Sequence, residues 1–236
     1  MSQVVYLIPS VLAEEAVETI PSYVLEAVRD CKVLFVENER TARRFLKKMS
    51  KEIVIDSFEW FVIPKHENEA NSMLQSFKQK IEEKKNIGII SEAGCPGIAD
   101  PGQQLVSVAQ QLQVRVKPLV GPSSILLALM ASGMNGQQFQ FVGYLPIDQA
   151  SRAKALRELE SESRKKNCTI VFIETPYRNN QLLETITKVC SSSTSLSIAA
   201  NLTAKNEMIS TKKISEWKKQ LPGLNKQPVI FCMLAK

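Results

Sequence analysis

The feature that most constrains the fold is the alternation of short apolar runs with helical patterns along the first half of the chain. The apolar runs are rich in Val and Ile and are typical of strands buried on both faces; they lie at 4–8, 33–36, 53–56, 87–91 and 114–118. Helical patterns lie between them, at 21–30, 41–49, 67–84 and 102–112. Because parallel strands need crossover connections of this kind, the first half is predicted to be a doubly wound, mostly parallel α/β domain.

The second half of the chain has a different organisation. A helical run from 122 to about 133 precedes a sequence of expected elements: strand 138–144, helix 148–166, strand 169–174, helix 178–190, strands 195–200 and 208–212, helix 214–220 and strand 229–234. The late strands have short connections, which favour antiparallel pairing and therefore a mixed sheet. We predict two α/β domains, residues 1–118 and 119–236.

Composition and charge exclude several classes of protein. A content of 44% hydrophobic and 23% charged residues indicates a folded chain. The first residues lack the pattern of a secretory signal, and no apolar run reaches the length of about 18 residues that a membrane span needs, so we expect a cytoplasmic protein and no membrane. Five dispersed cysteines and a single histidine argue against a disulfide framework and against a metal site. The net charge of +6 favours a polyanionic partner.

The stretch SEAGCPGIADPG, residues 91–102, follows the predicted strand 87–91. The carboxyl ends of strands in open α/β sheets are where such proteins bind ligands. Gly94 and Gly97 permit backbone conformations that other residues avoid, and Pro96 and Pro101 stiffen the loop. The stretch is therefore a candidate small-molecule loop, and a tight crossover without a ligand is the alternative.

Two other segments also follow predicted strands. VGPSSI contains Ser123 and Ser124, which can cap the next helix or contact a ligand, and IETPYR contains a carboxylate and an arginine. The sequence contains no P-loop, no dinucleotide fingerprint and no GxSxG elbow. His66, in KHENE, can act as a single base or make a surface hydrogen bond.

These segments together resemble a known family. SEAGCPGIADPG is similar to the Ser-Asp-Ala-Gly-x-Pro-x-x-x-Asp-Pro-Gly signature of the tetrapyrrole methylase superfamily, and within it to the bacterial enzymes that methylate a ribose 2′-hydroxyl of a cytidine in 16S ribosomal RNA. VGPSSILLALMASGM, FQFVGYLP, IETPYR and KHENE resemble further motifs of these enzymes, in matching order. The likeness extends from about residue 4 to residue 234.

The resemblance implies S-adenosyl-L-methionine bound in a cleft between two α/β domains, usually in a homodimer, and structured RNA or the small ribosomal subunit as the substrate. It also implies which residues hold the cofactor. These candidates are Pro9, Ser91, Glu92, Ala93, Gly94, Cys95, Ile98, Ser123, Ser124, Ile173, Leu202 and Thr203.

The segments on the expected substrate side depart further from the family pattern. PSVLAE stands where the family has Pro-Thr-Pro-Ile-Gly-Asn, and ENER stands where it has Glu-Asp-Thr-Arg. Methylation of a tetrapyrrole-like small molecule, or cofactor binding without catalysis, therefore stay open as alternatives. Candidates for the proton acceptor are Glu37, His66, Glu92 and Glu174, with none singled out.

A basic stretch provides candidates for RNA binding. Arg40, Arg43, Arg44, Lys47, Lys48 and Lys51 lie on and after one predicted helix. They can hold phosphates or form a solvated helix face. Arg40 and Arg44 are taken as substrate candidates, together with Arg178 at the end of a predicted strand, where a guanidinium can make bidentate phosphate contacts.

Overall fold

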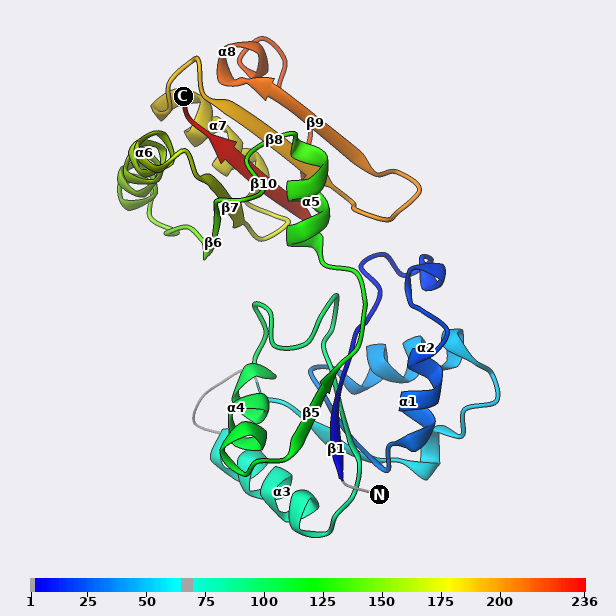
Figure 1. Cartoon of the computed structure of the whole chain (residues 1–236). Coiled ribbons are helices and arrows are strands. Elements are labelled where there is room, and N and C mark those ends of the chain that lie inside the picture. Colours follow the sequence, from blue (N-terminus) through cyan, green and yellow to red (C-terminus); the bar gives the residue numbers. More distant parts are fainter. Residues whose placement is uncertain (1–2, 65–69) are drawn as a thin grey trace. The chain divides into compact units, whose positions relative to one another are not determined.

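The computed structural model describes residues 3–64 and 70–236. Its contacts divide the chain into an N-terminal unit, Met1–Ser123, and a C-terminal unit, Ser124–Lys236 (Figure 1). The sequence analysis placed the boundary between residues 118 and 119. The segment KHENE, with His66, lies outside the described residues.

Five parallel strands form the sheet of the N-terminal unit, in the order β3-β2-β4-β1-β5. Their bounds are β1 Val4–Ile8, β2 Val33–Val36, β3 Glu59–Val62, β4 Ile87–Ile90 and β5 Arg115–Pro118. All residues of β2 and β4 are buried, as expected for central strands covered on both faces. The prediction of a doubly wound parallel sheet is confirmed.

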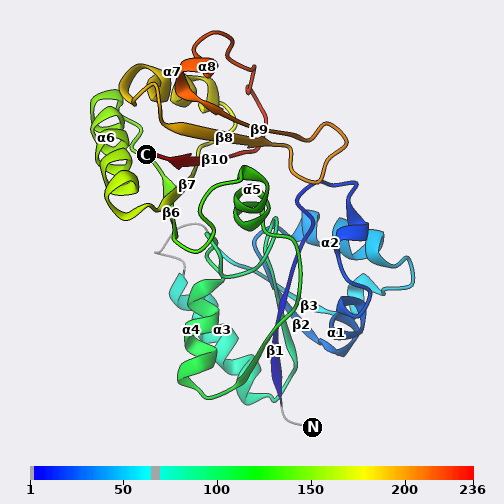
Figure 2. The ribbon, with the colours of Figure 1, turned by 45° about the horizontal axis from the view of Figure 1, so that its top comes forward.

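Helices cover both faces of this sheet (Figure 2). α1, Val24–Asp30, and α2, Glu39–Met49, pack on one face, whereas α3, Ala70–Glu82, and α4, Gln103–Gln111, pack on the other. The chain therefore leaves β1 toward one face and leaves the neighbouring β4 toward the opposite face. The loops after these two strands diverge, which creates the switch point where open α/β sheets bind ligands.

The prediction of a strand at 53–56 is wrong. Residues Ile55–Ser57 form the 3-10 turn η2, and the edge strand β3 begins at Glu59. Ile53 is apolar because it packs in the core beside α1 and α2, not because it belongs to the sheet. The ladder begins where the amide of Glu59 donates to the carbonyl of Lys32, at 2.9 Å, and this partner is distant in sequence.

The C-terminal unit has a mixed sheet, in the order β6-β7-β10-β8-β9. β6 and β7 are parallel, and the other neighbours are antiparallel, which confirms the predicted mixed sheet. The strands are β6 Phe139–Tyr144, β7 Thr169–Ile173, β8 Ser195–Ala200, β9 Met208–Lys213 and β10 Val229–Leu234.

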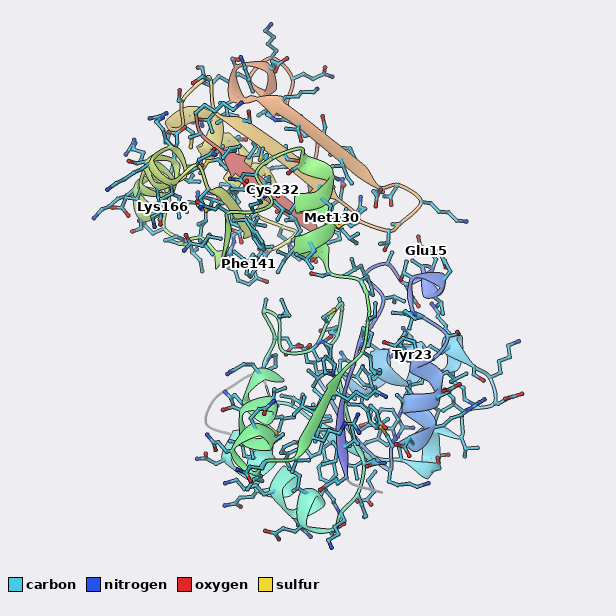
Figure 3. The ribbon with its side chains drawn as sticks, in the orientation of Figure 1. Glu15, Tyr23, Met130, Phe141, Lys166 and Cys232 are labelled. Carbon is cyan, nitrogen blue, oxygen red and sulfur yellow. The ribbon has the colours of Figure 1, made fainter. Side chains whose placement is uncertain are left out.

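Helices also lie on both faces of the second sheet. α6, Gln149–Lys166, α7, Asn179–Val189, and α8, Ile214–Trp217, pack on one face, and α5, Ser124–Ser132, contacts β8, β9 and β10 from the other. Cys232 of the central strand β10 is consequently fully buried, whereas Lys166 is exposed at the end of α6 (Figure 3). In the described part of the chain, none of the helices has the length and apolar character that crossing a membrane would require.

Candidate functional site

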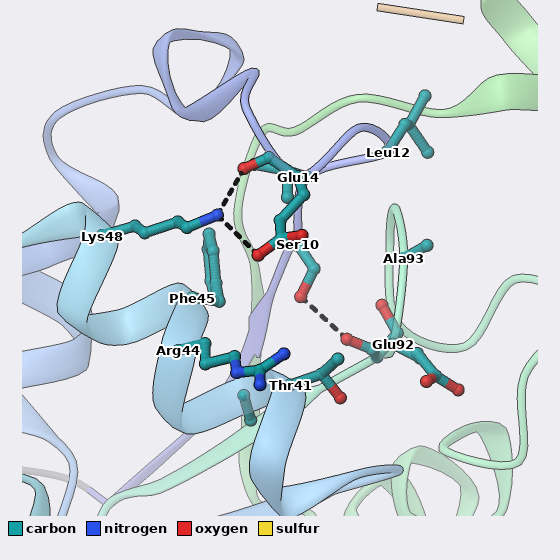
Figure 4. A pocket seen from close by; sticks show the side chains of 12 residues that line it. Ser10, Leu12, Glu14, Thr41, Arg44, Phe45, Lys48, Glu92 and Ala93 are labelled. Carbon is teal, nitrogen blue, oxygen red and sulfur yellow. Dashed lines mark hydrogen bonds and ion pairs between the residues drawn. The ribbon is translucent and has the colours of Figure 1, made fainter. Parts of the chain in front are cut away.

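A pocket of about 200 Å³ opens at the switch point of the N-terminal unit (Figure 4). The loop after β1 lines it with residues 10–12 and 14, the loop after β4 with residues 91–93, and α2 with side chains of its first three turns. Sites that enclose a whole small molecule commonly measure about 300–1,000 Å³. The pocket therefore has room for part of a ligand.

Backbone and hydroxyl groups join the two loops that form the pocket. Ser10 and Gly94 exchange two backbone hydrogen bonds, with the Ser10 amide donating at 2.8 Å and the Gly94 amide at 3.1 Å. The Ser10 hydroxyl donates to the carbonyl of Ser91 at 2.8 Å, and the Ser91 hydroxyl donates to the carbonyl of Gly94 at 2.9 Å. These bonds hold the two loops together, so the pocket is shaped before any ligand arrives.

Gly94 explains why the loop after β4 needs glycine. Its φ is +76°, a conformation that residues with a Cβ rarely adopt. A Cβ at this position would lie 3.3 Å from the carbonyl oxygen of Pro122 and 3.4 Å from Leu12. Gly97 also has a positive φ, +81°, but nothing lies within 4 Å of a Cβ placed there. Position 94 therefore favours glycine for two reasons: its positive φ, and the close contact that a Cβ would make with Pro122 and Leu12.

The rest of the loop after β4 is tied down by side chains. The Cys95 thiol donates to the carbonyl of Pro122 at 3.4 Å, and burial raises its pKa. Asp100 Oδ1 accepts hydrogen bonds from the amides of Gly97, at 2.9 Å, and Gly102, at 2.7 Å. Burial raises the pKa of Asp100, and the two amides oppose that rise. Ile98 is exposed on the same loop.

The raised pKa of Asp100 makes a prediction about stability and pH. The stability that depends on its protonated form is complete below the ordinary value of 3.8 and is lost as the pH rises through the raised folded value. Asp100→Asn keeps an acceptor oxygen and removes the titration. The free energy of unfolding of the unmodified chain, relative to this variant, should fall as the pH rises above the ordinary value of 3.8, measured by urea unfolding. A difference that is constant or grows with pH contradicts the assignment.

The basic residues of α2 fall into distinct environments. Lys48 Nζ lies 2.8 Å from Glu14 Oε1, and this contact lowers the pKa of Glu14. Arg43 pairs with Glu39 at 2.7 Å and stacks over Trp60, 5.0 Å from its ring. The side chain of Arg44 points into the pocket (Figure 4).

The remaining cations of this stretch lie outside the pocket. Arg40 is exposed and does not line it. Lys47 and Lys51 also lie outside it, and Lys47 Nζ donates to the Lys51 carbonyl at 3.0 Å. Of the two substrate candidates on α2, the structure thus places only Arg44 in the pocket.

Two of the carboxylates named as candidate bases lie near the pocket. Glu37 Oε1, just after β2, accepts a hydrogen bond of 2.8 Å from the amide of Glu92 and so holds the loop after β4 in place. The side chain of Glu92 is exposed and lines the pocket.

In the C-terminal unit, Glu174 follows Ile173 at the end of β7, and its side chain is fully buried. Glu174 Oε1 accepts from Arg178 Nη2 at 2.7 Å, from Arg178 Nε at 3.0 Å and from the amide of Thr175 at 2.6 Å. Glu174 Oε2 is buried and has no hydrogen-bond partner among the described residues. The guanidinium of Arg178 is therefore engaged within its own unit.

The other candidates for cofactor binding lie in three places. Pro9 is buried and packs so closely on Gly121 that a Cβ there would lie 2.1 Å from that of Pro9. Ser123 ends the N-terminal unit and Ser124 begins α5. Leu202 and Thr203 lie in the loop between β8 and β9, where Leu202 is buried and Thr203 has a φ of +69°. Thr203 Oγ1 is buried without a hydrogen-bond partner in the described part of the chain.

Sequence reasoning missed the residues that the loop after β1 contributes to the pocket. Ser10, Leu12 and Glu14 line it, although this loop contains no glycine and departs from the family's Pro-Thr-Pro-Ile-Gly-Asn pattern. Their position was the available signal, because they follow the carboxyl end of a parallel strand just as Ser91 does. The contribution of Thr41 and Phe45 depends on the orientation of α2, which the sequence does not specify.

A comparison with protein families gives a match for residues 16–218, to the Tetrapyrrole (Corrin/Porphyrin) Methylases. The chain belongs to the tetrapyrrole methylases. The expectation drawn from its motifs is thereby confirmed.

Several relatives carry the name Ribosomal RNA small subunit methyltransferase I. The protein from Escherichia coli O157:H7 is 33% identical over 151 residues, which cover 64% of this chain and 51% of that protein. The protein from Micromonospora olivasterospora is 28% identical over 215 residues, which cover 91% of this chain and 64% of that protein. The match spans about half to two thirds of the length of these relatives.

Solved structures show the same fold at low sequence identity. Diphthine synthase superposes with a TM-score of 0.68 and 14% identity, covering 100% of this chain and 90% of that one. Uroporphyrin-III-C-methyltransferase from Thermus thermophilus superposes with a TM-score of 0.58 and 15% identity, covering 99% and 93%. The two α/β domains are therefore those of the tetrapyrrole methylase fold.

The residues of this tetrapyrrole methylase fit a ligand such as S-adenosylmethionine. In the N-terminal unit, a Cβ at Gly94 would lie 3.3 Å from the carbonyl oxygen of Pro122, so glycine suits the tight loop that lines the pocket. In the C-terminal unit, Thr203 Oγ1 is a buried polar atom that lacks a partner among the described residues, and a polar ligand could supply one. Within residues 3–64 and 70–236, no three potential ligands of the His, Cys, Asp or Glu type gather to hold a metal ion.

Proposed function

We propose that this chain is an S-adenosylmethionine-dependent methyltransferase that acts on a ribose 2′-hydroxyl of ribosomal RNA. Family membership and the names of its relatives support the reaction and the substrate. The observation that carries the proposal is the loop after β4, which Ser10 and Gly94 join to the loop after β1 at the switch point of a parallel sheet.

The cofactor, when bound, supplies a methyl group on a positively charged sulfur. The residues proposed to hold it are those of the loop after β4 and their counterparts from other loops. In the N-terminal unit they are Pro9, Ser91, Glu92, Ala93, Gly94, Cys95, Ile98 and Ser123, and in the C-terminal unit Ser124, Ile173, Leu202 and Thr203. Catalysis by such a site depends on orienting the reacting groups and on accepting one proton.

We assign the proton acceptor to Glu92. Transfer of a methyl group to a ribose hydroxyl releases a proton, which a carboxylate can accept. Of the other candidates, Glu37 and Glu174 already accept hydrogen bonds, from the Glu92 amide and from Arg178 respectively, and His66 lies outside the described residues. The Glu92 side chain is exposed and lines the pocket, so its carboxylate is accessible to a substrate.

The test is transfer of a radiolabelled methyl group from S-adenosylmethionine to 30S subunits, and to total RNA, from a strain that lacks this gene. We expect label on one ribose. Absence of label, with cofactor binding confirmed by calorimetry, would contradict the RNA substrate and point to a small molecule or to a protein that binds the cofactor without turnover.

The resemblance also supports a homodimer and a cytoplasmic location as parts of this proposal. Sedimentation equilibrium of the purified chain tests the first, with the mass of two chains as the expected result. Fractionation of cells tests the second.

A further inference from the structure

We propose that the pocket in the N-terminal unit is a phosphate subsite, in which the guanidinium of Arg44 binds a backbone phosphate of the RNA. This inference rests on the proposed function, because it names the part of the RNA that the pocket receives. It separates Arg44 from the other cations of α2, which the sequence alone presents as one basic stretch.

The charges around the pocket leave one cation available. Four charged side chains line it, and two of them, Glu14 and Lys48, neutralise each other across 2.8 Å. The carboxylate of Glu92 points away from Arg44 (Figure 4). Arg44 makes no ion pair within 4 Å and no side-chain hydrogen bond with any residue in the described ranges 3–64 and 70–236, and its guanidinium faces the pocket. It acts on Glu14 only at longer range, and it lowers the pKa of that carboxyl less than Lys48 does.

The surroundings of Arg44 suit an anion. Thr41 and Phe45 lie on the same side of α2 and line the pocket together with Arg44. The side chain of Arg44 is exposed, so an anion from solvent can reach its guanidinium. The hydroxyl of Thr41 donates to the carbonyl of Asn38 at 3.1 Å, which leaves the guanidinium as the principal donor toward the pocket.

Phosphate is the anion that these features favour. The planar guanidinium presents paired donors that match two oxygens of a phosphate. A cavity of about 200 Å³ has room for a phosphate and its sugar, below the range of about 300–1,000 Å³ for whole small molecules. Lys48 Nζ makes two hydrogen bonds, both to Glu14, so one of its three donors can add to the same site.

Lys47 provides a matched control on the same helix. It carries the same charge as Arg44 but does not line the pocket, and its Nζ donates to the Lys51 carbonyl at 3.0 Å. Arg44→Gln and Lys47→Gln each remove one positive charge from α2. A general effect of charge would appear in both variants, whereas a phosphate subsite is lost in Arg44→Gln alone.

The experiment measures the anisotropy of a fluorescein-labelled single-stranded oligoribonucleotide with the full chain at several KCl concentrations. We expect Arg44→Gln to weaken RNA binding by about tenfold. The slope of the logarithm of the binding constant against the logarithm of the KCl concentration should become shallower by about 0.7–1. Lys47→Gln should change the affinity by less than about twofold and leave the slope unaltered. The affinity for S-adenosylmethionine, measured by calorimetry, should be the same in the unmodified chain, in Arg44→Gln and in Lys47→Gln.

The other outcomes overturn the subsite or separate it from the proposed function. Equal losses of RNA affinity in the two variants, or a loss of cofactor affinity in Arg44→Gln with RNA binding unchanged, overturn the subsite. Absence of RNA binding by the unmodified chain overturns both proposals. RNA binding that depends on Arg44, without methyl transfer, retains the subsite and rejects the proposed function. Methyl transfer by Arg44→Gln with an unaltered KM for RNA retains the proposed function and rejects the subsite.

Discussion

Replacing Gly94 by Val should abolish binding of S-adenosylmethionine while both units stay folded. The φ of +76° is strained for a β-branched residue, and the added Cβ would press on the carbonyl of Pro122 at 3.3 Å. The loop after β4 would move, and its bonds with Ser10 would break. We expect the calorimetric affinity to fall by at least about 100-fold, equivalent to about 2.7 kcal/mol.

Gly97→Val is the matched control for this change. Gly97 has a similar φ, +81°, so the strain in the backbone is comparable, but a Cβ there meets nothing within 4 Å. This variant should keep most of its cofactor affinity. Circular dichroism should show the same secondary structure in both variants. An unchanged affinity in Gly94→Val would remove this loop from the cofactor site.

Replacing Arg178 by Ala should lower the stability of the C-terminal unit. The side chain of Glu174 is fully buried, and Arg178 donates two of the hydrogen bonds that Glu174 Oε1 accepts. Removing one partner of a buried pair costs about 3–5 kcal/mol, and because Arg178 is 28% exposed we expect a smaller loss of about 2–3 kcal/mol in urea unfolding.

The double variant Glu174→Gln with Arg178→Ala separates the pair from the arginine itself. Without the buried carboxylate, loss of Arg178 should cost less, so the double variant should be more stable than Arg178→Ala. Equal stability of the two would contradict a buried-charge origin. Any loss of RNA binding by Arg178→Ala should also be compared with the double variant, because Arg178 was named from the sequence as an RNA contact.

Several elements of the fold were predictable because their signal is local. β1, β2 and β10 begin and end where the apolar runs predicted, since a strand buried on both faces needs an unbroken apolar run. β8 also has its predicted bounds, although Ser197 interrupts its apolar residues. The edge strand β3 was not predictable in this way. It is half exposed, and its position depends on pairing with β2, so the apolar run at 53–56 was a misleading guide.

The sequence by itself determined the family, the parallel and mixed sheets, and the loop after β4 with Gly94 and Gly97, because each depends on residues close together in the chain. Only the tertiary structure decided which charges are available. Arg43 and Arg44 are neighbours in the sequence, yet one pairs with Glu39 and stacks on Trp60 while the other faces the pocket. Lys48 likewise pairs with Glu14, which is distant from it in the sequence. The physical reason is that charge pairing depends on the direction of each side chain and on partners that folding brings near, and local sequence patterns specify neither.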